Sequence, residues 1–202
     1  MSTLPQLVNG NALEHGITMF VDHGGGSASQ MHVGGQANAQ VAAGTSHENS
    51  TDEGTLSVFT IPANTLVAGS TIRFWAAGVV EDNNGSDTLT TLVRLGTSTT
   101  DRSNQQVFAS RAIDVADNDV YCFHGLIQIR TAGSGGTAVG MSSLQDPDAS
   151  GTTNGSWNYT ASFSVDTTAA LRLAITGDWS AANADNECNS EIFVVDIVNP
   201  ST

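Results

Sequence analysis

The chain contains no lysine, and this absence excludes several classes of function. Its 202 residues hold six arginines against twenty Asp and Glu residues, so the formal net charge is −14. Without lysine there is no Gly-Lys-Ser/Thr phosphate loop, no Schiff-base lysine and no pyridoxal enzyme. So much negative charge also opposes binding to a phosphate backbone, and we expect no nucleic-acid partner. Asp outnumbers Glu fourteen to six, which together with the missing lysine fits a saline environment.

The sequence also lacks long apolar runs and has only two cysteines. No stretch of about 20 apolar residues is available to span a membrane. The first residues show no basic region followed by an apolar run, so we expect no secretory signal and synthesis in the cytoplasm. Cys122 and Cys188 are then expected to stay reduced, with pairing as the alternative in an oxidising place. Cys122 alternates with apolar residues, which predicts a core position.

Helical periodicity is nearly absent, and the chain from residue 55 onward has the pattern of short strands. Segments rich in β-branched and aromatic residues follow one another, separated by Gly, Asn and Pro. The predicted strands are 55–61, 70–80, 88–95, 106–115, 120–131, 137–141, 157–165, 170–176 and 191–198. This number of strands predicts an all-β fold, an antiparallel jelly-roll β-sandwich.

The first 54 residues have a different composition. They are rich in Gly, Ala and Ser and contain a single plausible strand at 17–21, so this part cannot bury much apolar surface by itself. We therefore predict two parts, an extended arm over residues 1–54 and the jelly-roll sandwich over residues 55–202.

The alternation within 157–165 predicts which side of that strand faces the core. Every second residue is apolar and every residue between is polar, which fixes the register of a half-buried strand. The face predicted to be buried carries Trp157, Tyr159, Ala161, Phe163 and Val165. A second apolar face is predicted from Tyr121, Phe123, Ile127 and Ile129.

The last strand is apolar on both sides. Phe193, Val195 and Ile197 form one side, and Ile192, Val194 and Val198 form the reverse. A strand that is apolar on both sides needs cover on both. The pattern therefore predicts contact with a neighbouring subunit through the reverse side.

Two segments carry a resemblance to a known family. Residues 55–80 predict a strand, a Pro62-Ala-Asn corner and a second strand, and this phrase resembles tailed-bacteriophage structural proteins of jelly-roll type. Residues 166–179, continuing to the strand at 192–198, are similar to the closing strands of the same phage domains, and the strand order between the two segments agrees. Cys188 departs from the pattern, where an apolar residue or Thr is expected. The resemblance covers roughly residues 55–198.

The resemblance implies a virion structural protein that is made in the host cytoplasm and located on the capsid surface. We expect a capsid decoration (cement) protein, a homotrimer that binds the major capsid protein and stabilises the particle. The candidate capsid or subunit contacts are Ile17, Met19, Phe20, Ile192, Val194 and Val198. The alternative is a receptor- or carbohydrate-binding tip of a phage head or tail fibre, with exposed aromatics such as Trp75 or Trp179 stacked on sugar rings.

Candidate chemistry is sparse. The histidines His15, His23, His32 and His47 fit no compact metal-ligand spacing. The glycine-rich stretch 133–140 joins two predicted strands instead of opening a helix, so we interpret it as a hairpin connection and not a phosphate loop.

Acidic residues are interpreted as structural. The stretches 81–87 and 114–119 have turn chemistry and lack the spacing of a helix-loop-helix calcium site. Asp196, inside the last strand, is the carboxylate in the most apolar setting, and we interpret it as edge-facing or bonded at an interface. A pair of carboxylates in a groove would be the enzymatic alternative, a polysaccharide-degrading sandwich. We predict no enzyme activity, no cofactor and no metal site.

Overall fold

The computed structural model describes residues 17–22, 28–33, 36–82, 86–110, 112–116, 118–147 and 153–199. Within these residues the regular elements are strands, apart from one turn of 3-10 helix, η2 (Asp101–Ser103). The strands pair in antiparallel fashion throughout the described part of the chain. The predicted all-β antiparallel sandwich is confirmed. No helix among the described residues is long and apolar enough to cross a membrane.

Two sheets form the sandwich, and they differ in size. The larger one runs in the order β12 (Thr153–Val165), β11 (Gly136–Pro147), β10 (Asp119–Thr131) and β6 (Thr71–Glu81). The far edge of β6 is shared by β15 (Ile192–Val198), which pairs with β3 (Gln36–Ala39), and β14 (Glu187–Cys188), which pairs with β4 (His47–Glu48). The smaller sheet runs β5 (Gly54–Ile61), β13 (Leu171–Trp179), β7 (Thr88–Gly96) and β8 (Gln105–Ala109), with β9 (Ile113–Asp114) also paired to β7.

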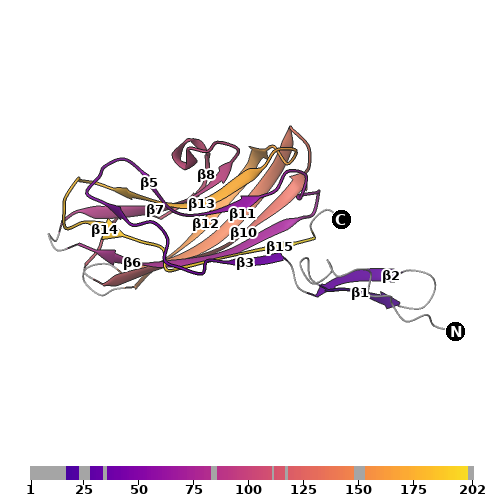
Figure 1. The fold of residues 1–202 in the computed structure, drawn as a ribbon, viewed down its shortest axis with the longest axis horizontal. Helices are drawn as coiled ribbons and strands as arrows, with labels where there is room; N and C mark the ends of the chain where they lie inside the picture. Colours follow the sequence, from indigo (N-terminus) through magenta and orange to yellow (C-terminus); the bar gives the residue numbers. More distant parts are fainter. Residues whose placement is uncertain are drawn as a thin grey trace.

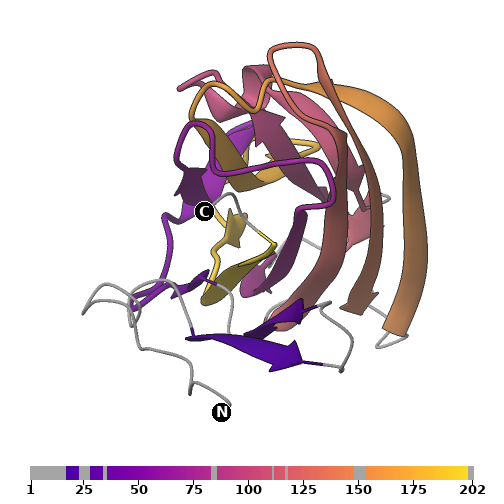
Figure 2. The same ribbon diagram turned by 90° about the vertical axis from the view of Figure 1, so that its right-hand side faces the viewer.

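The larger sheet curls around the smaller one, so its outward side is convex (Figure 2). A separate two-stranded ribbon, β1 (Ile17–Asp22) and β2 (Ala28–Val33), stands clear of the sandwich at one end (Figure 1). The chain then enters the sandwich through β3, which forms an edge of the larger sheet.

One continuous core lies between the two sheets. The inward residues of β10 and β15 that were predicted to be buried are confirmed there: Tyr121, Phe123, Ile127, Ile129, Phe193, Val195 and Ile197. Leu173 and Ile175 from β13 lie opposite them, fully buried. Trp179 is also buried, and its Nε1 donates to the His47 carbonyl oxygen at 3.4 Å, so it is not an exposed sugar-binding residue.

The predicted register of β12 is only half right. Phe163 and Val165 are buried as expected, but Trp157 is 79% exposed and Tyr159 is 68% exposed. The cause is a bulge: Ala138 of β11 pairs with Phe163, whereas Gly140 pairs with Thr160, so β12 has one more residue than its partner here. One extra residue exchanges the two faces of a strand. Upstream of the bulge, the aromatic residues therefore point outward.

Thr160 takes the inward position that the simple alternation assigned to its aromatic neighbours. Its Oγ1 donates to the carbonyl oxygen of Val107 in β8. This bond connects an edge strand of the larger sheet to an edge strand of the smaller one, since β12 and β8 are both outermost in their sheets. The side chain thus closes the sandwich along one side.

The two cysteines are free thiols on opposite sides of the larger sheet. Cys188 is fully buried, and burial raises the pKa of its thiol to about 12. Cys122 was predicted to be core, which is wrong. It alternates with the buried Tyr121 and Phe123 and therefore lies on the outward side, partly exposed.

The glycine-rich stretch 133–140 lies at the hairpin connection from β10 to β11, as predicted, and its residues from Gly136 onward already belong to β11. Gly133 has φ +114°, a conformation that L-residues with a side chain rarely adopt. Its N–H donates to the Thr167 hydroxyl at 2.8 Å. The stretch is a turn followed by the start of a strand, so it does not open a helix that could bind a phosphate.

Candidate interaction surface on the larger sheet

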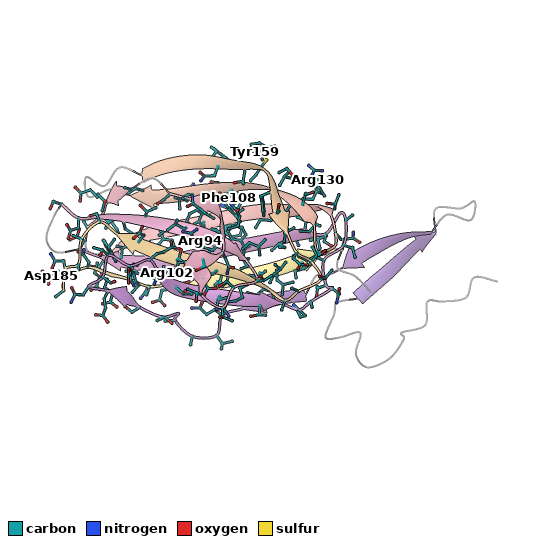
Figure 3. The ribbon with its side chains drawn as sticks, turned by 90° about the horizontal axis from the view of Figure 1, so that it is seen from above. Arg94, Arg102, Phe108, Arg130, Tyr159 and Asp185 are labelled. Atoms are coloured by element: carbon teal, nitrogen blue, oxygen red, sulfur yellow. The ribbon has the colours of Figure 1, made fainter. Side chains whose placement is uncertain are left out.

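The outward side of the larger sheet carries most of the large apolar side chains that the structure leaves exposed. We call this side the outer face. Its exposed apolar residues are Trp75 (55%), Val120 (54%), Leu126 (49%), Met141 (55%), Trp157 (79%), Tyr159 (68%) and Ile192 (52%). Figure 3 shows Tyr159 at the outer border of the molecule, beside β12, while Phe108 lies within the sandwich.

The strand register arranges these residues in neighbouring rows across the sheet. One row crosses the sheet from β15 to β12, and each of its residues is paired with the next one on the neighbouring strand. Its members are Val194, Trp75, His124, Ser143 and Trp157. The next row on the same face is formed by Asp196, Arg73, Leu126, Met141 and Tyr159. Directly paired side chains on one face lie about 5 Å apart, so the apolar residues adjoin one another.

The first row is closely packed. The Trp75 and His124 rings lie 5.1 Å apart between centroids with an interplanar angle of 31°. The Trp75 Nε1 donates to Cys122 Sγ at 3.2 Å. Ser143 is only 7% exposed although it lies on an outward side, which indicates that the rings on either side cover it. The contacts with His124 and Cys122 therefore hold the Trp75 side chain in place before any partner binds.

The charges in the second row pair with each other. An Arg73 guanidinium nitrogen donates to Asp196 Oδ2, and the two residues are opposite each other in register. Asp196 therefore has an ion-pair partner within the sheet, which accounts for a carboxylate in this apolar strand. The centre of the outer face presents apolar groups and a neutral ion pair.

Polar groups of the smaller sheet form a second cluster, on its outward side. Glu53 Oε1 accepts from Arg94 Nε at 2.8 Å and from Thr176 Oγ1 at 2.5 Å. Asp101 accepts from Arg172 Nε at 2.7 Å and from Arg172 Nη2 at 2.9 Å. These bonds attach the loop before β5 and helix η2 to the sheet, so the cluster is a structural network.

Two groups beside this cluster have shifted pKa values. Burial raises the pKa of the Asp178 carboxyl, and the nearby Glu53 carboxylate raises it further, while His47 and Arg94 act in the opposite direction. Burial lowers the pKa of His47, while the nearby Asp178 carboxylate raises it by a smaller amount. Two carboxyl groups lie near each other here, yet Glu53 is already engaged by Arg94 and Thr176.

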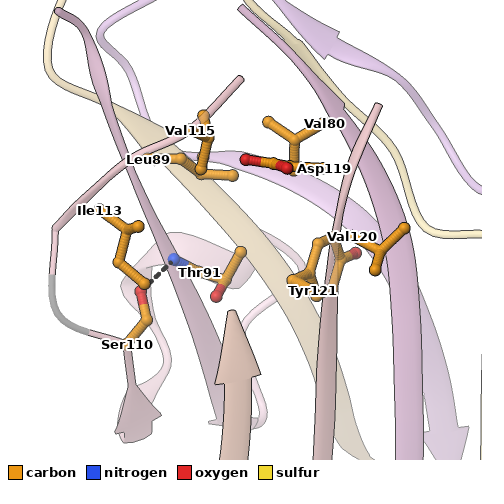
Figure 4. A pocket seen from close by; sticks show the side chains of 9 residues that line it. All are labelled: Val80, Leu89, Thr91, Ser110, Ile113, Val115, Asp119, Val120 and Tyr121. Atoms are coloured by element: carbon orange, nitrogen blue, oxygen red, sulfur yellow. Dashed lines mark hydrogen bonds between the residues drawn. The ribbon is translucent and has the colours of Figure 1, made fainter. Parts of the chain in front are cut away.

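The hollows described within the chain do not resemble substrate sites. One cavity between the sheets has a volume of about 10 Å³, near the minimum for a single water molecule (Figure 4). Asp119 beside it accepts from the Ala116 N–H at 2.8 Å. An open depression beside β5 is lined mainly by small residues, among them Ala43, Gly44 and Ser57. Among the residues that the structure describes, no three His, Cys, Asp or Glu side chains are placed to hold a metal ion.

The predicted contact residues fall into two groups. Ile192, Val194 and Val198 lie on the outer face, with Ile192 half-exposed and the two valines partly buried. Ile17, Met19 and Phe20 belong to β1, for which the structure describes the backbone and its pairing. The role of all six as contacts stays a prediction. His15 and His23 lie outside the described residues.

Sequence reasoning missed the centre of the outer face. Leu126, Met141 and Tyr159 were not recognised as exposed surface residues. For Leu126 the signal was present, since it shares the outward side of β10 with Cys122, His124 and Gln128. For Tyr159 the alternation in the sequence predicted burial, and the bulge in β12, which the sequence does not show, turns this residue outward.

The chain matches no family model and no curated protein sequence. Solved structures to which it is similar include VP2 of infectious bursal disease virus in a subviral particle, with 12% identity and a TM-score of 0.34. That match covers 88% of this chain and 37% of the VP2 chain, so this chain spans little more than a third of its length. A seed lectin of Lotus tetragonolobus matches with 8% identity and a TM-score of 0.36, over 92% of this chain and 100% of the lectin. At these scores neither likeness bears on function.

Proposed function

We propose that this protein is a non-enzymatic structural component of a virus particle, a decoration (cement) protein that assembles on the outer capsid surface through its outer face. One observation carries the proposal: large apolar side chains adjoin one another on the outward side of an ordered sheet. Extended apolar patches of this kind mark sites of association in soluble proteins. The resemblance of residues 55–198 to jelly-roll virion proteins supports the viral setting.

The shape and chemistry of the outer face favour a protein partner. The face is convex (Figure 2), and its centre contains the aliphatic residues Leu126 and Met141 next to the aromatic ones. Protein interfaces are enriched in aromatic residues and Met at their centre and depleted in charge. The homotrimer and the major capsid protein remain the partners that we propose for this face.

A decoration assay with charged variants tests the proposal. Capsids assembled without the protein are mixed with the wild type or with Leu126→Glu, and the copies bound per particle are quantified after sedimentation. Leu126 is half-exposed, so the variant should fold, which circular dichroism and thermal unfolding will verify. Thr60→Glu, at an exposed position on β5, is the matched control. We expect many copies of the wild type and of the control on each particle, and few of Leu126→Glu. Equal binding by all three would refute the proposal.

A second candidate function rests on the exposed aromatic residues near the free edge of the sheet. Trp157 and Tyr159 are the two most exposed aromatic side chains of the outer face, and flat rings of this kind also stack on sugars. A receptor- or carbohydrate-binding fibre tip would use them. Glycan binding that is lost in Trp157→Ala and kept in Leu126→Glu would favour this reading over decoration.

A further inference from the structure

One border of the larger sheet is a long strand without charge. β12 is the terminal strand of this sheet, and among the described strands it pairs with β11 alone. It forms the right-hand border of the larger sheet in Figure 2. Its 13 residues, 153–165, include no Asp, Glu, Arg, His or Pro. Proteins protect exposed strand edges with charges, prolines, bulges, short strands or covering segments. Apart from the bulge after Thr160, β12 has none of these devices.

The other borders of the two sheets are short or covered. β3, at the opposite border of the larger sheet, has four residues, and β4 has two. β8, at one border of the smaller sheet, has five residues. β5, at the other border, has eight residues, but the segment before it covers its edge. There the Thr45 N–H donates to the Leu56 carbonyl oxygen at 2.9 Å, and Ser57 Oγ donates to Gln40 Oε1 at 2.5 Å.

The hydrogen-bond pattern shows which main-chain groups of β12 face its free edge. In an antiparallel sheet, successive residues of a strand bond alternately to the neighbour on one side and on the other. On β10, the Ile129 N–H donates towards β6, to the Ser70 carbonyl oxygen at 2.8 Å. The odd-numbered residues of β10 therefore bond to β6 and the even-numbered ones to β11. Since His124 pairs with Ser143, the odd-numbered residues of β11 bond to β10, and the even-numbered ones bond to β12.

On β12, the main-chain groups of Trp157 and Tyr159 are the ones left over. Ser142 is even-numbered and bonds to its partner on β12, Asn158. The residues on either side of Asn158 therefore direct their N–H and C=O groups away from β11. Neither Trp157 nor Tyr159 forms a main-chain hydrogen bond to another described segment. A row of such unpaired donors and acceptors is a template for a further strand.

A second copy of β12 is the strand that fits this template. An added strand must have a free edge of its own, and β12 is the long uncovered edge within the described part of the chain. Charge agrees, because copies with a net charge of −14 repel each other, whereas β12 brings no charged side chain to the contact. We propose that β12 of one copy pairs antiparallel with β12 of a second copy, so that the two larger sheets join into one.

This contact is isologous, because both copies contribute the same strand. A two-fold axis then crosses β12, and both free edges become paired, so the contact closes with two copies. The second copy lies beside the outer face and not on it. The inference therefore goes beyond the proposed function and leaves the outer face to the capsid. If the predicted homotrimer also forms, the assembly in solution contains three such pairs.

A proline at position 159 tests the edge in the full-length chain. Proline has no N–H, and edge strands accept it where that N–H would face solvent. Tyr159→Pro therefore keeps the bonds to β11 and removes a donor from the free edge. Tyr159→Thr is the matched control, since it also removes the ring but keeps the N–H and a side chain that favours strands. We expect light scattering after size exclusion to give an even number of chains for the wild type and the control, and half that mass for Tyr159→Pro.

Urea unfolding checks the direction of the main-chain groups. Asn158→Pro removes a donor that bonds to β11, so it should lower the free energy of unfolding much more than Tyr159→Pro does. Equal losses would show that the N–H of residue 159 does not face the edge, and the inference would fail. It also fails if the wild type has the mass of one or of three chains, or if Tyr159→Pro and Tyr159→Thr have the same mass.

Crosslinking tests the two-fold axis without proline. Tyr159→Cys is combined with Cys122→Ser, which removes the partly exposed thiol, while Cys188 is fully buried and unreactive. A short bismaleimide then joins two chains where residue 159 of one copy lies near residue 159 of the other. We expect a strong band of two chains on a denaturing gel, and a weak one for Thr60→Cys in the same background. A heterologous contact brings different residues together, so equal bands for the two variants would overturn the proposal.

Adding Leu126→Glu to the crosslinking variant separates this inference from the proposed function. Leu126 lies on the outer face, so this substitution should prevent capsid decoration and leave the two-chain band unchanged. If the band disappears with Leu126→Glu, the outer face joins the copies, and the inference falls while the proposed function stands. If the band remains and the capsids are still decorated, the proposed function falls and the β12 pair stands.

Discussion

Phe163 and Trp157 lie in the same strand, yet their contributions to stability should differ greatly. Phe163 is 9% exposed and packs in the core, whereas Trp157 is 79% exposed. Truncation of a buried aromatic residue typically costs about 3–5 kcal/mol, and substitutions at exposed positions usually change stability by less than about 0.5 kcal/mol. We expect Phe163→Ala to lose the first amount and Trp157→Ala to remain near the wild type in urea unfolding. Equal losses would show that the aromatic residue upstream of the bulge is buried after all.

Asp178 should make the protein's stability depend on pH. Its pKa is raised in the folded state, chiefly by burial and by Glu53. Folding therefore favours the protonated form, and this contribution is present below the unfolded pKa of about 3.9 and is lost as pH rises through the folded pKa. At neutral pH the ionised carboxylate is disfavoured in its site. We expect Asp178→Asn to raise the free energy of unfolding at pH 7, and the gain to shrink towards pH 4.

Asp166 provides a control of opposite sign. Its carboxylate accepts from the Thr168 hydroxyl at 2.6 Å and from the Thr168 N–H at 2.9 Å, and these bonds lower its pKa. Its contribution is present above the unfolded pKa and is lost as pH falls through the folded one. Asp166→Asn should therefore not stabilise the protein at pH 7. The same gain in both variants would indicate a general effect of reduced net charge.

At the scale of single elements, β12 shows where sequence reasoning reached its limit. The alternation over 157–165 correctly predicted a strand and the burial of Phe163 and Val165. A bulge leaves the alternation in the sequence unchanged but exchanges the faces, because its extra residue is defined by the partner strand. The glycine-rich hairpin at 133–140 was predictable because it depends on local turn chemistry alone.

The bulge gives Thr160 a role that its neighbour Ser162 lacks. Thr160 donates to the Val107 carbonyl oxygen across the seam between the sheets, while Ser162 is exposed. A hydrogen bond of this kind contributes about 0.5–1.5 kcal/mol. We expect Thr160→Val to lower the free energy of unfolding by that amount and Ser162→Ala to leave it nearly unchanged. If Ser162→Ala were the more damaging, the bulge would lie elsewhere in the strand.

At the scale of the whole molecule, the fold class and the core of the sandwich followed from the sequence, but the exposed face did not. Apolar residues on both sides of the last strand predicted a contact through its reverse side, where Ile192 is half-exposed, and that contact stays a prediction. Leu126 and Met141 belong to the β10–β11 hairpin and come near Trp75 only through the register between β10 and β6, which lie far apart in the chain. A surface assembled from distant segments has no local signal in one sequence.

Salt should strengthen self-association. Copies with a net charge of −14 repel each other, and the proposed β12 contact contains no charged side chain. The Debye length falls from about 30 Å at 0.01 M ionic strength to about 3 Å at 1 M, so added salt removes the repulsion and leaves the uncharged contact. We expect the oligomer fraction in light scattering to rise over this range. A falling fraction would indicate ion pairs between copies.

The placement of the tryptophans gives the protein its own optical reporter. Trp75 and Trp157 stand in water on the outer face, whereas Trp179 is sealed within the sandwich. Indole emission moves to shorter wavelength when water is excluded, so two of the three fluorophores respond when the outer face is covered and the third does not. Association can then be followed in unlabelled protein, at concentrations and on timescales at which a fluorescent tag on this surface would itself disturb the contact.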